Sequence, residues 1–470
     1  MKKIRLNTLI LLSIVFVLTA CGKEQTQNDA QEGQQEVVIA AVGITDPEVV
    51  DMTMYRLNES IQQFNESQSN YVVRLEIIPV EPSSTGFDGK PQYTGDDIAA
   101  GAQKLSVDLV TGTGGYDLLW LDSLTLPTIN VQGLLRTGAL EDLGSWLDKK
   151  GGLERNDFFN IILSAYDLDG TIFALPAEVR VECMSGNSDL LGDRTEWTLR
   201  EFLDFAAEYP DMRINIGWYP APAALTLFQE GNISFAQKNE NGQLVFDDKL
   251  LGDLIEFAKN GSSRQGELGI KLSYLDLNTA REYRSLDPAP KTFIGFPSQD
   301  KQNGCLVENI RSLSICSNSD CKEGAWAFLE YYLLHNEDNR NDKNNFNPNR
   351  GAYPAVKEVF ENRMAEELYI QWVRDENGEI ILDEEGNPQQ RMISENNGFV
   401  YPPITEEDVA FVRDFLLSPR GAHLRLVTTN QLTKILSEEC VPYYLDEKPL
   451  DEVVNIIKRR MMSYYLENAI

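Results

Sequence analysis

The sequence YDLLWL, from Tyr116 to Leu121, is an apolar run of strand length that follows a glycine-rich break over Gly112–Gly115. Before the break, Asp96 and Asp97 open a segment whose apolar residues recur at helical spacing. These apolar residues are Ile98, Ala102, Leu105 and Leu109. An acidic first turn, a single apolar stripe and a glycine stop predict a helix that leads into a buried strand.

The same alternation extends towards the N-terminus. Val37–Val42 is a β-branched apolar run, and Tyr71–Ile78 alternates apolar with charged residues until Pro79 stops it. Between these two strands, Val49–Phe64 carries apolar residues at helical spacing. Strands and helices that alternate in this way predict an α/β fold with a mainly parallel sheet and helices on its faces. In such sheets, ligands bind beyond the carboxyl ends of the strands.

Further elements are predicted downstream. Thr198 and Glu201 form a capping box at the start of a helix, and Gly231–Asp247 has two strand-like runs around an Asn-Gly turn. Two later segments, Cys321–Leu334 and Leu450–Met461, each place apolar residues on one helical face.

The chain has 470 residues, of which 42% are hydrophobic and 24% charged, and this composition is typical of a folded protein with more than one domain. The formal net charge of -31 would repel phosphate backbones, so we do not expect a nucleic-acid partner. His335 and His423 are too few for histidine-rich zinc sites or Ser/His/Asp triads. We therefore expect no metal, no cofactor and no catalytic residues. The acidic segment Arg374–Arg391 has two turn signals and predicts an exposed hairpin.

Residues 1–20 have the pattern of an export signal. Three basic residues precede an apolar run over Leu9–Leu18 that is too short to span a bilayer stably. The string LTACG, Leu18–Gly22, resembles the lipobox of bacterial lipoproteins, which implies cleavage before Cys21 and attachment of lipid to its thiol. Cleavage would change the formal net charge from -31 to -34. The alternative is an ordinary signal peptide with an incidental cysteine.

The segment after the signal is polar and rich in Gln and Glu over Gly22–Glu36, so we expect a flexible tether at residues 21–36. Five other cysteines are present: Cys183, Cys305, Cys316, Cys321 and Cys440. Because they are odd in number and form no repeating frame, we expect buried free thiols rather than a disulfide scaffold. A local pair of Cys316 with Cys321 is the alternative.

Six segments of the body occur in a recognisable order. Tyr116–Leu143 joins an Asp-aliphatic strand to a Gly-Leu-Leu passage, and Asp169–Ser185 contains Asp-Gly, an aromatic residue and Leu-Pro. The other segments are Trp197–Asp211, Phe293–Leu333, Arg350–Glu361 and Ile435–Glu467. Their succession resembles the extracellular solute-binding proteins of family 1, the lipoprotein receptors of ABC importers that include maltose-type sugar binders.

This resemblance implies the two-lobed, type II periplasmic-binding-protein fold, in which each lobe has a mainly parallel sheet and the lobes close around one solute. Lobe 1 would comprise residues 37–177 and 298–349, and lobe 2 residues 178–297 and 350–470. The crossovers would fall near Pro176–Val181, Ile294–Pro297 and Asn347–Tyr353.

A sugar site needs aromatic rings for stacking and planar polar groups for paired hydrogen bonds. Trp218 and Tyr219 are the best aromatic pair, with inter-helix packing as the alternative. Asp122 and Ser123 follow the strand Tyr116–Leu121, and Asp46 follows the first strand, so these polar residues are candidates for ligand binding. A cap or turn role is the alternative for all three.

The crossovers supply the remaining candidates. Glu178 and Arg180 lie on the first crossover and either line the cleft or pair with each other. Tyr353 lies at the third crossover and is expected to close over the ligand, whereas Trp326 is expected in the core.

The sequence thus predicts a monomeric receptor, anchored by lipid to the outer side of the cell membrane, that captures a sugar or oligosaccharide and delivers it to ABC permease subunits. No reaction is expected. One alternative is a binding protein for a peptide or polyamine, which the negative charge mildly favours. The other alternative is a secreted glycoside-degrading lipoprotein, because two of the chain's many carboxylates would suffice as the acid and the nucleophile.

Overall fold

The structure is a computed structural model that describes residues 33–467, apart from residues 46–51, 86–89, 150, 217–223, 226, 229–232, 262–267, 286–290, 300, 302–303, 336–351, 371, 376, 390–402 and 425. Its described part contains a mixed sheet of ten strands. These strands are β1 (Gln35–Gly43), β2 (Tyr71–Pro79), β5 (Leu118–Asp122), β8 (Leu175–Asn187), β9 (Arg213–Asn215), β12 (Leu268–Tyr274), β13 (Lys291–Ile294), β14 (Cys305–Ile315), β15 (Ala352–Pro354) and β16 (Ala422–Leu424).

Three short hairpins and a set of helices complete the described fold. The hairpin strands are β3 (Ser84–Thr85), β4 (Pro91–Gln92), β6 (Asp167–Leu168), β7 (Thr171–Ile172), β10 (Ala236–Lys238) and β11 (Leu244–Phe246). The helices are α2 (Met52–Ser67), α3 (Gly95–Thr111), α4 (Val131–Arg136), α5 (Gly144–Leu147), α6 (Asn160–Ala165), α7 (Ser188–Leu191), α8 (Leu199–Glu208), α10 (Asp248–Gly261), α11 (Leu277–Ser285), α12 (Lys322–His335), α13 (Lys357–Ile370), α14 (Glu406–Leu417), α15 (Val427–Tyr444) and α16 (Leu450–Glu467), with 3-10 turns η1 (Leu126–Thr128) and η2 (Arg155–Asp157).

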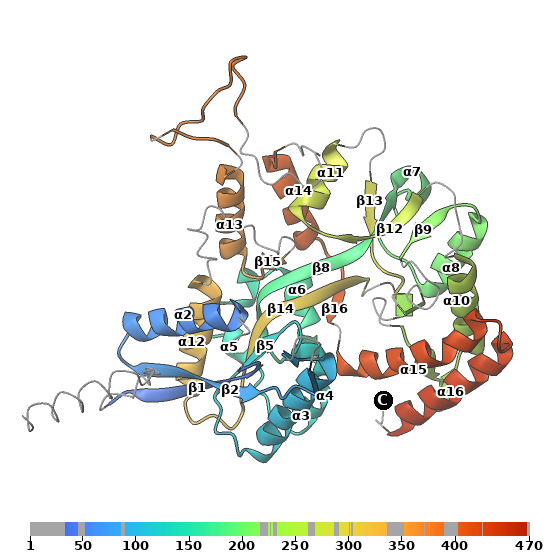
Figure 1. Ribbon diagram of the computed structural model, residues 1–470, viewed down its shortest axis with the longest axis horizontal. Coiled ribbons are helices and arrows are strands. Elements are labelled where there is room, and N and C mark those ends of the chain that lie inside the picture. Colours follow the sequence, from blue (N-terminus) through green and yellow to red (C-terminus); the bar gives the residue numbers. More distant parts are fainter. Residues whose placement is uncertain are drawn as a thin grey trace, which may run out of the picture.

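The N-terminal strands pair as the sequence predicts. β1 is parallel to both β2 and β5. Alternate residues of β1 face opposite ways, so that Val42 lies against Gly101 of α3, whereas Gly43 lies beside Met54 of α2. Helices therefore cover both faces of this part of the sheet (Figure 1). The α/β prediction is confirmed.

Local signals place the helix ends. Thr94 forms a capping box with Asp97 at the start of α3, and Gly112 ends the helix in the left-handed conformation, with φ 68°. The predicted capping box of Thr198 and Glu201 starts α8. The Asn-Gly turn joins β10 to β11, where Gly242 has φ 74°.

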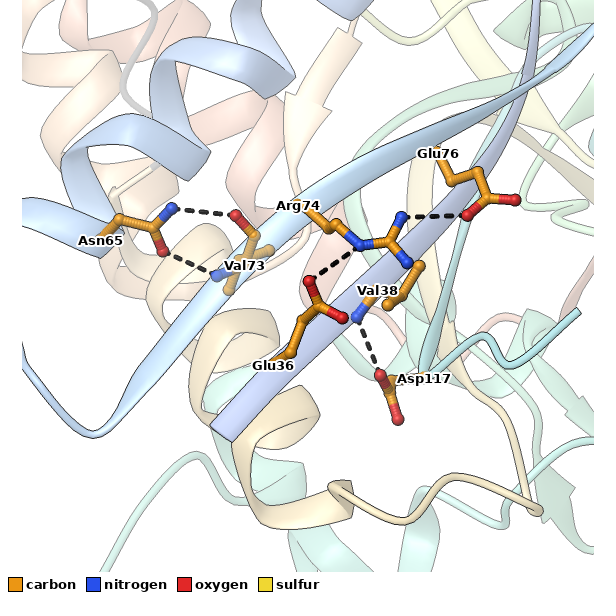
Figure 2. Close-up of polar contacts among 7 residues, drawn as sticks. All are labelled: Glu36, Val38, Asn65, Val73, Arg74, Glu76 and Asp117. Atoms are coloured by element: carbon orange, nitrogen blue, oxygen red, sulfur yellow. Dashed lines mark hydrogen bonds and ion pairs between the residues drawn. The ribbon is translucent and has the colours of Figure 1, made fainter. Parts of the chain in front are cut away.

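Side chains complete the hydrogen bonding of the sheet at its edge, as Figure 2 shows. β2 is the edge strand, and the amide of Asn65 brackets Val73 by accepting from its N–H at 2.8 Å and donating to its carbonyl at 2.9 Å. The Asp117 carboxylate accepts from the N–H of Val38 at 2.8 Å. Arg74 forms ion pairs with Glu36 of β1 and Glu76 of β2, at 3.0 Å each. The backbone groups of Val73 on β2 and the N–H of Val38 on β1 thus have side-chain partners.

Two separate hydrophobic cores meet at β8 and β14, which run side by side across the middle of the molecule (Figure 1) and contribute buried residues to both cores. The first core includes buried residues from Val37 to Cys183, and the second starts at Met184. On β14, Leu306 packs in the second core and its neighbour Val307 in the first. The described chain is therefore two-lobed, and these strands connect the lobes.

One long segment packs elsewhere than the predicted lobes imply. Buried residues from Tyr353 to Leu426 belong to the first core, although the sequence assigns residues 350–470 to lobe 2. The reason is strand pairing, because β15 pairs with β8 at Val179 and β16 pairs with β14 at Cys305–Val307. From Leu432 onward the buried residues belong to the second core. The lobe boundaries as such stay a prediction.

The acidic segment projects from the body as an arm above α13 (Figure 1, orange). It consists of two successive turns rather than one hairpin. Asp375 and Asp383 each accept bonds from the backbone N–H groups two and four residues later, at 2.8 to 3.0 Å. The prediction that this segment is exposed is confirmed for its described residues.

The cysteines are also placed as expected. Cys183, Cys305, Cys316, Cys321 and Cys440 are free and buried, so Cys316 and Cys321 form no disulfide in this structure. Among the helices that the structure describes, none is long and apolar enough to cross a membrane.

Candidate functional site

The polar face of β8 lies where the two cores meet. Because strand residues alternate between faces, Glu178, Arg180 and Glu182 point one way, whereas Val179 and Val181 pack in the first core. Residues of neighbouring elements join this polar face. We use the name hinge seam for the following group: Glu178, Arg180 and Glu182 of β8, Tyr274 of β12, Glu308 and Arg311 of β14, and Arg363 of α13.

The buried end of the hinge seam is an ion cluster. Glu178 and Arg311 stand opposite each other on β8 and β14 and are only 2% and 3% exposed. The carboxylate of Glu178 accepts from Nε and Nη2 of Arg311 and, at 2.7 Å, from Nη1 of Arg363. Burial by itself would raise the pKa of Glu178, but the charges of the two arginines outweigh it and lower the pKa to about 2. This cluster joins β8, β14 and α13.

The other end of the hinge seam is partly open to solvent. Arg180 donates to Glu308 at 2.8 Å, and the two side chains are 22% and 29% exposed. The guanidinium carbon of Arg180 lies 5.4 Å from the ring centre of Tyr274, which is 40% exposed. Partial burial and then the charge of Glu182 raise the pKa of Tyr274 to about 12. An aromatic ring, a guanidinium and carboxylates thus meet at an accessible place between the cores.

Asp122 and Ser123 lie next to the seam at the end of β5. Asp122 stands opposite Arg311 in the antiparallel pairing, and its Oδ1 accepts from the N–H groups of Leu124 and Thr125 at 3.0 and 2.7 Å. It therefore has the turn role that the sequence left open. Ser123 lines a hollow beside Glu308. The hollow has a volume of about 40 Å³, which holds a few water molecules rather than a sugar ring.

Several predicted residues lie elsewhere. Tyr353 is 3% exposed and packs edge-on against Phe360 in the first core, so it does not cover the seam as expected. The reason is strand pairing. Tyr353 of β15 stands opposite Val179 of β8, so both side chains lie on the apolar face of the sheet. Trp326 packs against the first core and stacks on Trp146, which confirms its predicted core role. Asp46, Trp218, Tyr219 and Cys21 lie outside the described residues.

Glu178 and Arg180 do not pair with each other. Each takes a partner from β14, Arg311 and Glu308 respectively, because cross-strand neighbours are closer than residues two apart on one strand. Glu178 supports the seam from within, and Arg180 is the accessible one of the two.

Five seam residues were missed by sequence reasoning: Glu182, Tyr274, Glu308, Arg311 and Arg363. One signal was available. Arg311 interrupts the small and apolar run at the end of β14, and a charge in a buried strand requires an opposite charge nearby. The sequence does not reveal which distant carboxylate supplies it.

Solved structures resemble this chain over most of its length. The extracellular solute-binding protein family 1 from Alicyclobacillus acidocaldarius has a TM-score of 0.48 at 11% identity, with 92% of this chain and 98% of that chain covered. An ABC substrate-binding protein from Listeria monocytogenes, solved with cycloalternan, has a TM-score of 0.45 at 12% identity, covering 92% and 99%. The de novo designed cysteine esterase ECH19 has a TM-score of 0.52 at 13% identity, covering 93% and 100%.

Two hydrophobic cores connected by β8 and β14 give the described chain two lobes. At such low identities the likeness concerns the fold and not the ligand. Neither a protein-family model nor a curated protein matches the sequence. The hinge seam lies on β8 and β14, the strands that connect the two cores.

Proposed function

We propose that this chain is a lipid-anchored extracellular receptor that captures a sugar or oligosaccharide between its two lobes and delivers it to the permease of an ABC transporter. Cys21 would carry the lipid, and residues 22–36 would tether the folded body to the membrane. The chain itself would make or break no bond. Its part is to bind and release.

One observation carries this proposal: two hydrophobic cores are connected by strands whose shared face carries accessible polar and aromatic groups. Separate cores permit the lobes to move as rigid bodies, while the continuous strands β8 and β14 bend or twist at the hinge. The hollow beside Glu308 is far smaller than a typical ligand pocket. Movement of the lobes would widen this hollow for a solute.

The accessible end of the hinge seam fits the chemistry of a sugar. Glu308, whose partner in the structure is Arg180, provides a carboxylate that accepts paired hydrogen bonds from neighbouring hydroxyls. Tyr274 provides a partly exposed ring on which the apolar face of a pyranose stacks. Asp122 and Ser123, at the end of β5, are close enough to the seam to extend the site.

A ligand screen tests the proposal. We expect one sugar or oligosaccharide of a broad panel to raise the melting temperature of the purified protein, since a ligand at 100 times its Kd adds about 2.7 kcal/mol to the free energy of unfolding. Tyr274→Ala should weaken that binding about tenfold through loss of the stacking surface. The measurement is differential scanning fluorimetry, followed by calorimetric titration.

The matched control is Tyr369→Ala, since Tyr369 is 54% exposed but lies on α13, outside the seam. Its replacement should leave the affinity unchanged. Equal effects of the two tyrosine variants would contradict a site at the seam. Turnover of a chromogenic glycoside by the purified protein would contradict a pure receptor and favour the glycoside-degrading alternative.

A further inference from the structure

The exposed ring of the hinge seam is surrounded by carboxylates. Tyr274 stands opposite Glu182 in the pairing of β12 with β8. Arg180 lies two residues before Glu182 on the same face of β8, and Glu308 stands opposite Arg180. Both carboxylates act on the Tyr274 hydroxyl, because their charges contribute, after partial burial, to the raised pKa of that group. An aromatic face flanked by carboxylates is a common way of holding a cation in proteins.

This place already holds a cation in the structure, and it comes from the chain itself. The guanidinium of Arg180 lies over the Tyr274 ring at 5.4 Å and bonds to Glu308 at 2.8 Å. With 22% of its side chain exposed, Arg180 is accessible to a competing ligand. Arg180 thus occupies the position that an ammonium group of a solute would take.

The surrounding charges favour a cationic rather than an anionic solute. Each arginine of the seam is paired with a carboxylate: Arg180 with Glu308, and Arg311 and Arg363 with Glu178. A carboxylate or phosphate on the solute would meet these negative groups while the arginines are already engaged. The formal net charge of -31 adds a long-range attraction for cations.

We propose that the hinge seam recognises a solute with a primary ammonium group, which displaces Arg180 from Tyr274 and Glu308. The inference rests on the proposed function of the seam and specifies its ligand as an amine-bearing sugar. A free polyamine has the same ammonium chemistry without the sugar ring, so the experiment must separate the two sources.

The test compares ligands that differ at one group. Calorimetric titration at mildly acidic pH uses a glucosamine trimer, its N-acetylated form, maltotriose and spermidine. We expect the glucosamine trimer to bind at least about tenfold more tightly than its acetylated form, because acetylation removes the charge. Arg180→Gln should strengthen binding of the glucosamine trimer severalfold, since the internal competitor is gone. Glu308→Gln should weaken it about tenfold.

Arg413→Gln is the matched control, because Arg413 forms a half-exposed ion pair with Glu361 away from the seam and should leave all affinities unchanged. Weaker binding of the glucosamine trimer to Arg180→Gln would overturn the proposal, as would equal or tighter binding of the acetylated trimer. In both cases the sugar-receptor function would still stand. Binding of spermidine alone would support the ammonium site and refute a sugar ligand. Failure of the glucosamine trimer and spermidine to bind, while a neutral sugar binds, would refute the ammonium site and leave the sugar-receptor function standing.

Discussion

Replacement of Glu178 by alanine is expected to lower the free energy of unfolding by about 3–5 kcal/mol. The carboxylate is shared by Arg311 and Arg363, and it is 2% exposed. Its removal places two positive charges side by side at low dielectric, and water cannot replace the lost partner without opening the hinge. The measurement is urea denaturation followed by circular dichroism, with the midpoint and slope analysed together.

An exposed ion pair provides the control for this variant. Glu361 accepts from Arg413 through both oxygens at 2.6 Å, and its side chain is 45% exposed. Glu361→Ala should cost at most about 1 kcal/mol, because water solvates both groups after the change. If Glu178→Ala is no more destabilising than Glu361→Ala, the buried cluster does not stabilise the hinge in the way we describe.

The lowered pKa of Glu178 predicts that the protein loses stability in acid. The pKa of Glu178 is about 2 in the folded protein, below the ordinary value of 4.5 that it has when the chain is unfolded. Since the folded pKa is the lower one, its contribution is fully present above about pH 4.5 and disappears as the pH falls towards 2. The contribution is on the order of 3 kcal/mol. Unfolding curves of the parent and Glu178→Gln should therefore converge in this pH range, and parallel curves would contradict the assignment.

Replacement of Gly295 by alanine is expected to destabilise the protein by about 1–3 kcal/mol or more. Gly295 follows β13, where the chain passes between the cores, and its backbone is fixed by bonds to Thr195 and Trp197. A Cβ at this position would lie 2.8 Å from the Cα of Gly304 and 3.0 Å from its carbonyl. Backbone atoms cannot rotate away as a side chain does, so the two crossing segments would have to separate.

Gly252→Ala is the matched control, because the same substitution at this position should raise the free energy of unfolding instead of lowering it. Gly252 lies inside α10, and a Cβ there would meet Val454 and Leu450 at 3.8 and 3.9 Å, which is ordinary contact. Alanine stabilises a helix interior by about 1 kcal/mol relative to glycine. Thermal or urea unfolding measures the stability of both variants. A Gly295→Ala protein as stable as the parent would show that the close approach to Gly304 is not required.

Local patterns account for the elements of the N-terminal half. Burial of both faces of β1 follows from its continuous apolar run, and burial of one face of α2 and α3 follows from the spacing of apolar residues. The ends of α3 and α8 follow from Thr94, Gly112 and Thr198. These interactions join residues a few positions apart, so the sequence displays both partners together.

The candidate site was predictable only in part. Arg180 was found because the crossover on which it lies has a recognisable sequence, but its partner Glu308 is 128 residues away. Tyr274 has no distinguishing neighbours in the sequence, and its role arises from the pairing of β12 with β8. Tyr353 was assigned to the wrong environment because its strand adds to β8 with the tyrosine on the apolar face.

The sequence by itself determined the α/β class, the helix ends, the buried thiols and the order of segments that implies two lobes. Only the tertiary structure decided which charges meet on the hinge strands, and that the segment from Tyr353 to Leu426 packs with the first core. The physical reason is that periodicity and capping are local, whereas pairing between β8 and β14 brings together side chains more than a hundred residues apart.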